Sequence, residues 1–180
     1  MSVKPINIGV VGVGHLGIHH VKHYTTIPNV NLLGIYDPDV KRSNYVAKKY
    51  KTVAFQSLKK LIENVDALSI VTPTPNHYKT AKLCIENKKH VFIEKPITVT
   101  LEEANNLLDL SKNNSTIIQV GHIERLNPAL MALEPYYINP KFIEIQRLAP
   151  YTVRGTDVPV VLDKMIHDID ILLSLVDCPV

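Results

Sequence analysis

A glycine pattern that directly follows an apolar run constrains the fold of this chain more than any other feature of its sequence. Residues 6–11 form the run, and Gly12, Gly14 and Gly17 follow it with the spacing G-x-G-x-x-G. A helical pattern comes next, and Asp37 lies twenty residues beyond Gly17. Gly12 permits a tight turn, Gly14 lets a phosphate approach the backbone, and Gly17 lets the helix pack closely on the strand. This order is typical of a dinucleotide-binding βαβ unit, in which the helix N-terminus holds the phosphates.

Short apolar runs alternate with helical patterns along the first two thirds of the chain, which predicts an α/β fold with a parallel sheet and crossover helices. We expect strands at residues 6–11, 31–36, 67–71, 90–93 and 116–120, with a weaker one near 52–55. We expect helices at residues 15–26, 40–50, 57–63, 76–87 and 101–112. Thr100 and Glu103 have the spacing of a capping box at the start of the last helix.

The pattern changes after residue 120. Residues 121–127 indicate a loop, 128–137 a short helix, and 141–148 a strand in which polar and apolar residues partly alternate. Such alternation favours an open antiparallel sheet with one face in water. We therefore expect a dinucleotide-binding domain at residues 1–121 and part of a second, α/β domain at residues 122–180. This second part is short for an independent sheet domain, so the chain is expected to be truncated.

Composition narrows the classes of function. Apolar residues make up 46% of the chain and charged residues 21%, which is ordinary for a globular protein. The net charge of +3 is spread along the chain without a basic run, so we expect no nucleic-acid partner. No apolar stretch is long enough to cross a membrane, and the polar N-terminus is not a signal peptide. Cys84 and Cys178 lie far apart and form no metal-ligand pattern, which favours a reducing, cytoplasmic setting.

Asp37 ends the second expected strand, where a carboxylate can accept hydrogen bonds from the adenosine ribose of a dinucleotide. This favours NAD, because a carboxylate repels the 2′-phosphate of NADP. Lys41 and Arg42 lie one turn further on and would soften the preference, so NADP stays open. An alternative role for Asp37 is to cap the following helix. The two roles can coexist, and the spacing favours cofactor binding.

Two further turns follow expected strands at the edge where open α/β sheets bind ligands. The first is Thr72-Pro73-Thr74-Pro75-Asn76-His77, which two prolines make rigid. For His77, contact with the cofactor and an ordinary place at a helix start are equally open. The second turn is Glu94-Lys95-Pro96, whose lysine can reach a reacting oxygen as a donor or a charged stabiliser. A surface Lys-Pro turn is the alternative.

The expected helix at residues 161–176 carries two different faces. The apolar face holds Met165, Ile169, Leu172 and Val176, and the opposite face holds Asp163, His167, Asp170 and Ser174. A polar stripe on an apolar helix is expected where one edge lines a wet cavity. A carboxylate one turn from a histidine can orient its ring and raise its basicity, as a general acid–base requires. A solvated face with incidental ion pairs is an equally weighted alternative.

The remaining histidines give weaker signals. His15, His19 and His23 recur at helical spacing, but no clustered cysteine or carboxylate completes a site, so we expect no metal. His15 occupies a variable position of the glycine pattern, where it can touch the cofactor. For His20 the sequence indicates only surface polarity, and His122 lies at the domain boundary, where it can contribute to a cleft.

Taken together, these motifs resemble the Gfo/Idh/MocA family of oxidoreductases. The resemblance rests on the glycine pattern, the turn at 72–77, Glu94-Lys95-Pro96, residues 121–128, and Asp163 with His167. It implies a Rossmann domain, a second domain with an open, mostly antiparallel sheet, a nicotinamide cofactor, and sugar or polyol substrates. It implies that the cofactor is bound by Gly12, Gly14, His15, Leu16, Gly17, Asp37, Thr72, Pro73, Thr74, His77, Glu94 and Lys95.

The resemblance also implies a reaction. Lys95 would contact the reacting hydroxyl, His167 would handle its proton, and Asp163 would assist or bind substrate. Residues 121–128 are most similar to members that oxidise UDP-N-acetylglucosamine, and the full-length form would associate with itself through the second-domain sheet. The expected function is hydride transfer between a sugar or nucleotide-sugar carbon and the nicotinamide. The alternatives are a nucleotide-binding sensor without catalysis and a structural partner that pairs through residues 141–148.

Overall fold

The computed structural model describes residues 4–136, 138, 140–148 and 158–176. The chain divides into two compact units, Met1–Val120 and Gly121–Val180. Each unit is described by itself below. Cys178 and Tyr137, the last residue of one expected helix, lie outside the described residues.

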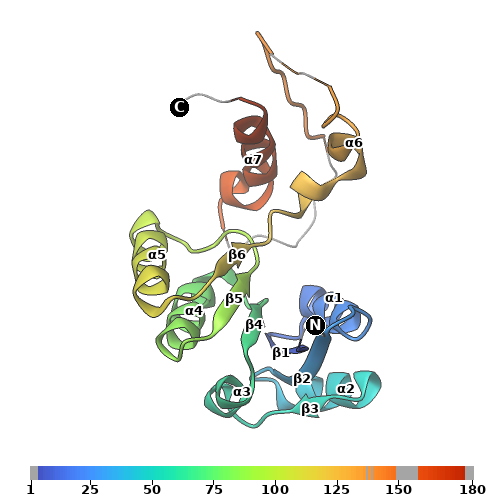
Figure 1. The fold of residues 1–180 in the computed structure, drawn as a ribbon, viewed down its shortest axis with the longest axis vertical. Helices are drawn as coiled ribbons and strands as arrows, with labels where there is room; N and C mark the ends of the chain where they lie inside the picture. Colours follow the sequence, from blue (N-terminus) through green and yellow to red (C-terminus); the bar gives the residue numbers. More distant parts are fainter. Residues whose placement is uncertain (1–3, 137, 139, 149–157, 177–180) are drawn as a thin grey trace. The chain divides into compact units, whose positions relative to one another are not determined.

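The first unit is built on a six-stranded parallel sheet with the order β3-β2-β1-β4-β5-β6 (Figure 1). The strands are β1 (Ile6–Val11), β2 (Val30–Tyr36), β3 (Val53–Ala54), β4 (Ala67–Ile70), β5 (His90–Ile93) and β6 (Ile118–Val120). The helices are α1 (His15–Tyr24), α2 (Val40–Tyr50), α3 (Leu58–Asn64), α4 (His77–Glu86) and α5 (Leu101–Asn114), with a 3₁₀ turn, η1, at Thr74–Asn76. The expected α/β fold with a parallel sheet is confirmed. The strand order reverses between β1 and β4, which is where such sheets bind ligands.

Helices cover both faces of this sheet and bury two apolar clusters. Neighbouring residues of a strand point to opposite faces, and Val10 and Val11 of β1 accordingly lie in different clusters. The Val10 cluster includes Val21 of α1 and Val46 of α2. The Val11 cluster includes buried side chains from α3, α4 and α5, namely Leu61, Ile62, Ala81, Cys84, Ile85 and Leu107. Helices α1 and α2 therefore pack on one face, and α3, α4 and α5 on the other.

Side-chain caps fix where two of the helices begin. The capping box expected for α5 is confirmed, because Thr100 Oγ1 accepts from the Glu103 N–H at 3.2 Å and Glu103 Oε2 accepts from the Thr100 N–H at 3.3 Å. Helix α2 is capped by Asp39, whose carboxylate accepts from the Arg42 N–H at 3.0 Å. The alternative role for Asp37 as the cap of this helix is therefore wrong, since the cap lies two residues later.

The second unit contains a 3₁₀ turn, η2 (Ile123–Leu126), the short helix α6 (Pro128–Met131), a π-helical segment, η3 (Val161–Met165), and helix α7 (Ile166–Leu175). Helix α6 is much shorter than the expected helix at residues 128–137. The reason is Pro135, whose ring would clash with the carbonyl four residues earlier, at Met131. The helix ends at that residue.

The strand expected at residues 141–148 is not formed, and the described part of the second unit contains no strand. A strand needs a neighbour to satisfy its backbone hydrogen bonds, and the described residues of this unit offer none. Phe142 and Leu148 are correspondingly 83% and 91% exposed. The pairing surface that residues 141–148 were expected to provide is thus not a strand edge in this structure.

The apolar core lies in the first unit. Every hydrophobic side chain that is buried among the described residues belongs to positions up to Leu107, and the second unit contributes none. A unit of about 60 residues buries a smaller fraction of its surface than a larger domain does. No helix within the described ranges is long and apolar enough to span a membrane.

Candidate functional site

The three glycines of the turn after β1 have different steric surroundings. Gly12 has a φ of +85°, and a Cβ there would lie 2.6 Å from the carbonyl oxygen of Val71. A Cβ on Gly17 would collide with the carbonyl oxygen of Gly12. At Gly14, by contrast, nothing lies within 4 Å of such a Cβ. Two glycines thus shape the turn, and the third leaves open space beside the backbone.

The N-terminus of α1 follows directly on this open space. Gly14 precedes the helix without a side-chain cap, and the first turn holds no acidic side chain. The first N–H groups of a helix have no intrahelical acceptor, and the helix dipole favours negative charge there. His15 and Leu16 lie in this first turn with exposed side chains. The arrangement suits a phosphate group.

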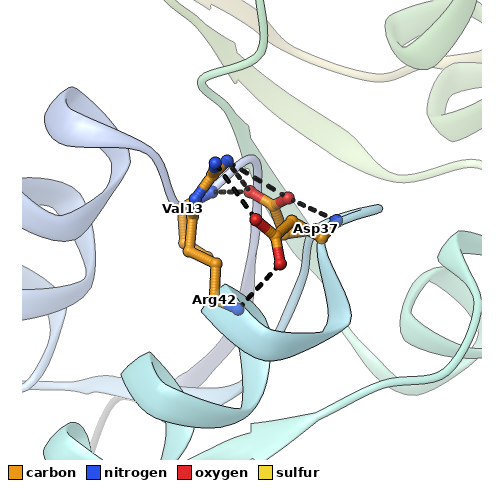
Figure 2. Close-up of polar contacts among 4 residues, drawn as sticks. Val13, Asp37 and Arg42 are labelled. Atoms are coloured by element: carbon orange, nitrogen blue, oxygen red, sulfur yellow. Dashed lines mark hydrogen bonds and ion pairs between the residues drawn. The ribbon is translucent and has the colours of Figure 1, made fainter.

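Asp37 connects the end of β2 to the glycine turn (Figure 2). Its side chain is buried, with the whole residue 6% exposed, and Oδ2 accepts from the Val13 N–H at 2.9 Å. Oδ1 accepts from the Asp39 N–H at 2.9 Å, and Arg42 Nη1 lies 3.5 Å from both oxygens. Each carboxylate oxygen has a second lone pair that can accept from a ligand hydroxyl. The sequence indicated the ligand role of Asp37 but not its contact with the turn.

A cavity of about 610 Å³ lies where the strand order reverses. It is lined by Val11, Gly12, Gly14, Tyr36, Asp37, Pro38, Arg42, Leu58, Val71, Thr72, Pro73, Asn76, Lys79, Thr80 and Leu83. Its volume is in the usual range for small-molecule and cofactor sites. Thr72 Oγ1 is buried and has no hydrogen-bond partner among the described residues. An orphaned hydroxyl, a carboxylate and an open glycine backbone together fit a ligand with ribose and phosphate groups.

The turn that contains Thr72 is held by His77, at the start of α4. The His77 ring is 1% exposed, with Nδ1 2.8 Å from the carbonyl oxygen of Pro96 and Nε2 2.8 Å from that of Thr72. Its side chain thus links the two turns, and a direct contact with a cofactor stays a prediction. Thr74, in the same turn, is buried, whereas Pro73 is exposed and lines the cavity.

The Glu94-Lys95-Pro96 turn follows β5 at the same edge of the sheet. Glu94 is 8% exposed, and its Oε1 lies 3.0 Å from His20 Nε2. Lys95 is half-buried, and the Lys95–Pro96 peptide bond is cis. The expectation that His20 is merely surface polarity is wrong, because its ring packs between α1 and the sheet. The available signal was its position one turn after Gly17, on the helix face that packs on the strand.

In the second unit, Asp170 of α7 binds the η2 turn. Arg125 donates to its carboxylate twice, from Nε to Oδ2 at 2.9 Å and from Nη2 to Oδ1 at 2.7 Å, and His122 Nδ1 lies 3.9 Å from Oδ1. These hydrogen bonds from Arg125 hold the pKa of the Asp170 carboxyl below its usual value. One residue of the polar face, Asp170, is therefore engaged in an ion pair. On the apolar face, Met165 and Ile169 are 46% and 41% exposed.

Asp163 and His167 do not share one regular α-helix. Asp163 lies in the π-helical segment and His167 in α7, and both are half-buried. The wider turn of a π-helix changes the direction of its side chains, so the expected face is regular only from Ile166 onward. These two residues belong to the second unit and Lys95 to the first. Their meeting in one active site stays a prediction.

Metal ligands do not cluster within the described ranges, where no group of three or more histidine, cysteine or acidic side chains could hold an ion. His15 and His19 lie ring to ring in an edge contact, with centroids 5.5 Å apart.

The chain is similar in sequence and in structure to known dehydrogenases. The chain is 39% identical over 168 residues to UDP-N-acetylglucosamine 3-dehydrogenase from Acidithiobacillus ferrooxidans, a match that covers 93% of this chain and 53% of the relative. The crystal structure of that protein superposes with a TM-score of 0.90 at 38% identity, covering 96% of this chain and 57% of the other. The chain is also 34% identical over 130 residues to scyllo-inositol 2-dehydrogenase (NAD(+)) from Bacillus subtilis, covering 69% of this chain and 37% of the relative.

This chain thus spans about half the length of the first of these relatives. The family described as "Oxidoreductase family, NAD-binding Rossmann fold" matches residues 6–122, which include all six strands of the parallel sheet. On this match, and on the identity to the two dehydrogenases, the chain belongs to the Gfo/Idh/MocA family of oxidoreductases.

Proposed function

We propose that the protein is an NAD-dependent dehydrogenase that transfers a hydride between the hydroxyl-bearing carbon of a sugar or nucleotide sugar and the nicotinamide ring. The observation that carries this proposal is the cavity at the reversal of strand order, where the open backbone at Gly14, the Asp37 carboxylate and the orphaned Thr72 hydroxyl meet. Membership of an oxidoreductase family with an NAD-binding fold supports it.

Different residues around the cavity bind different parts of the cofactor. The glycine turn and the N-terminus of α1 hold the pyrophosphate, and the second lone pairs of Asp37 accept from the adenosine ribose. In this proposal the cofactor supplies the hydrogen-bond partner that the Thr72 hydroxyl lacks among the described residues. A 2′-phosphate would face the buried Asp37 carboxylate, which Arg42 contacts only at 3.5 Å, so NAD binds more tightly than NADP.

Three residues act on the substrate in this proposal. When bound, the nicotinamide supplies the hydride acceptor. Lys95 donates a hydrogen bond to the reacting oxygen and stabilises its developing negative charge. His167 accepts the hydroxyl proton, and Asp163 orients that histidine or binds the substrate. The resemblance of the Glu94-Lys95-Pro96 and Asp163–His167 motifs to those of the family supports these roles.

The substrate class is inferred from the similarity of the second unit to UDP-N-acetylglucosamine 3-dehydrogenase from Acidithiobacillus ferrooxidans. Its identity to this chain covers 168 residues and so extends past the end of the family match at residue 122. We therefore favour a UDP-sugar such as UDP-N-acetylglucosamine over a free polyol. In the whole protein, the second unit would belong to a substrate domain with an open antiparallel sheet, through which two copies associate.

The test is steady-state turnover by the whole gene product, followed by the absorbance of reduced nicotinamide. We expect oxidation of UDP-N-acetylglucosamine with NAD, and a lower kcat/KM with NADP and with scyllo-inositol. Lys95→Met and His167→Gln should each lower kcat by about 10²-fold or more. Lys112→Met, which removes an exposed lysine from α5, is the matched control and should leave kcat unchanged.

Two results would overturn the proposal. Tight binding of NAD without turnover of any sugar, polyol or UDP-sugar would favour a nucleotide sensor. Wild-type kcat in both Lys95→Met and His167→Gln would remove the assigned roles, whatever the substrate.

A further inference from the structure

The Glu94-Lys95-Pro96 turn is held from both faces of the sheet by two histidines, one on α1 and one on α4. We propose that His20 and His77 are positioning residues that fix the backbone on either side of Lys95 and so aim its ammonium group. The inference rests on the proposed function in one respect, namely that Lys95 acts on the reacting hydroxyl. Neither histidine touches the substrate in this proposal.

His20 holds the residue before Lys95. The Glu94 carboxylate is buried, and a buried carboxylate is costly unless it is paired. His20 Nε2, at 3.0 Å from Oε1, provides the partner. The other ring nitrogen, Nδ1, lies 2.9 Å from Ser69 Oγ of β4, and the ring lies against Phe92 at 5.6 Å between centroids. These three contacts fix the position of the ring, which in turn restricts the position of the Glu94 carboxylate.

His77 holds the residue after Lys95. Nδ1 lies 2.8 Å from the carbonyl oxygen of Pro96 and Nε2 lies 2.8 Å from the carbonyl oxygen of Thr72. Carbonyl oxygens only accept hydrogen bonds, so in either contact the ring nitrogen is the donor. The turn that carries Lys95 is thus bound to the turn that lines the cofactor cavity.

The two contacts together leave Lys95 little backbone freedom. The Glu94 N–H also donates to the Ile70 carbonyl at 3.1 Å, which continues the pairing of β5 with β4 into the turn. A donor held within a fraction of an ångström of its productive position needs such support from its surroundings. Hydrogen bonds on both neighbours of Lys95 supply it here.

Asparagine and glutamine variants separate the two nitrogens of each ring. The amide nitrogen of asparagine lies at the same bond distance from Cβ as Nδ1, and that of glutamine at the same distance as Nε2. His20→Gln and His77→Asn therefore keep the contact with the Lys95 turn. Their matched counterparts, His20→Asn and His77→Gln, lose that contact and keep the one with Ser69 or Thr72. All four variants lose one hydrogen bond, so their melting temperatures should fall by similar amounts.

The first measurement is amide hydrogen exchange at Glu94, whose N–H donates to the Ile70 carbonyl, in the whole gene product with NAD present. Exchange should be about tenfold faster in His20→Asn and His77→Gln, the effect of losing one hydrogen bond at a buried partner. It should be close to wild type in His20→Gln and His77→Asn. With a sugar that the enzyme oxidises, kcat should fall about tenfold at unchanged KM in the first pair, His20→Asn and His77→Gln. It should stay near wild type in the second pair, His20→Gln and His77→Asn.

The outcomes separate this inference from the proposed function. Equal exchange at the turn in all four variants overturns the positioning role, whether or not the protein has activity. Faster exchange in the first pair, in a protein that turns over no sugar even as wild type, leaves the positioning role standing and contradicts the proposed function. Faster exchange with unchanged kcat shows that Lys95 does not need this support and overturns the inference.

Discussion

The shape of the glycine turn after β1 depends on single residues, because the space available to a side chain differs from one position to the next. At Gly12 and Gly17 the obstacle is backbone, which cannot move without dismantling the turn, whereas the space beside Gly14 is open. The same scale explains Asp37, because one carboxylate both accepts from the Val13 N–H and lines the cavity. The three glycines thus differ in their steric surroundings, as the different roles predicted from their positions in the pattern require.

Alanine at Gly17 should therefore impair folding, whereas alanine at Gly14 should impair cofactor binding. Gly17→Ala should lower the free energy of unfolding by about 2–3 kcal/mol, because its methyl group collides with the Gly12 carbonyl. Gly14→Ala should change it by less than about 0.5 kcal/mol but weaken NAD binding about tenfold, since the methyl group occupies the space that a phosphate needs. Urea unfolding and calorimetric titration measure the two quantities. Unaltered NAD affinity in Gly14→Ala would contradict the assigned cradle.

Among the helices, those of the first unit begin and end within two residues of the expected bounds, whereas those of the second depart from expectation at identifiable residues. Helix α6 ends four residues before Pro135, and the polar stripe of α7 is preceded by a π-helical segment. The stripe itself is anchored by Arg125, which reaches Asp170 from the η2 turn. Helix α7 therefore owes part of its stability to an ion pair.

This ion pair predicts a pH dependence. Because Arg125 lowers the pKa of Asp170 in the folded protein, the pair adds stability above about pH 4, where an unfolded aspartate is ionised. That contribution is lost as the pH falls through the lowered pKa. Arg125 is half-exposed, so we expect about 1 kcal/mol, or about fivefold faster amide exchange in α7 for Asp170→Asn at neutral pH. The ratio of variant to wild-type exchange should approach one as the pH falls below about 4.

Asp109→Asn, at an exposed position of α5, removes the same charge and serves as the control. It should leave exchange in α7 unchanged at every pH. A ratio for Asp170→Asn that stays constant across the acid range would show that the pair is not the source of the stability.

At the scale of the molecule, the buried apolar side chains among the described residues all lie in the doubly wound first unit. Cys84 lies in the cluster beneath α3, α4 and α5, and burial raises the pKa of its thiol to about 12. The described part of the second unit buries no hydrophobic side chain, so its order depends on ion pairs, turns and short helices. Resistance to opening should differ accordingly between the two units.

Cys84 reports on the opening of this core. At pH 8 its thiol is protonated and buried, so iodoacetamide should label it at least about 10³-fold more slowly than in the denatured chain. Leu107→Ala leaves a cavity in the same cluster and so destabilises the unit. It should accelerate labelling at least about tenfold. Mass spectrometry of the peptide that contains Cys84 measures both rates. Labelling of the native protein at the rate of the denatured chain would contradict a closed core.

Most of the parallel sheet and the glycine turn could be predicted, because apolar runs, glycine spacing and the Thr100–Glu103 capping box are local patterns. The helix expected at residues 128–137 is longer than the observed α6, because Pro135 ends it early. The strand at residues 141–148 could not be settled from alternation, since a strand exists only with a partner. The contact of His20 with Glu94 could not be predicted, because the two residues lie far apart in the sequence and meet only in the folded protein.

Local sequence patterns are sufficient to predict the alternation of strands and helices, the turn after β1 and the resemblance to the family. The tertiary structure decided which polar groups meet. Asp37 and Val13 are 24 residues apart, and Arg125 and Asp170 are 45 apart. The physical reason is range: periodicity and sterics act within one turn or strand, whereas a buried carboxylate finds its partner only when the elements that carry both have packed together.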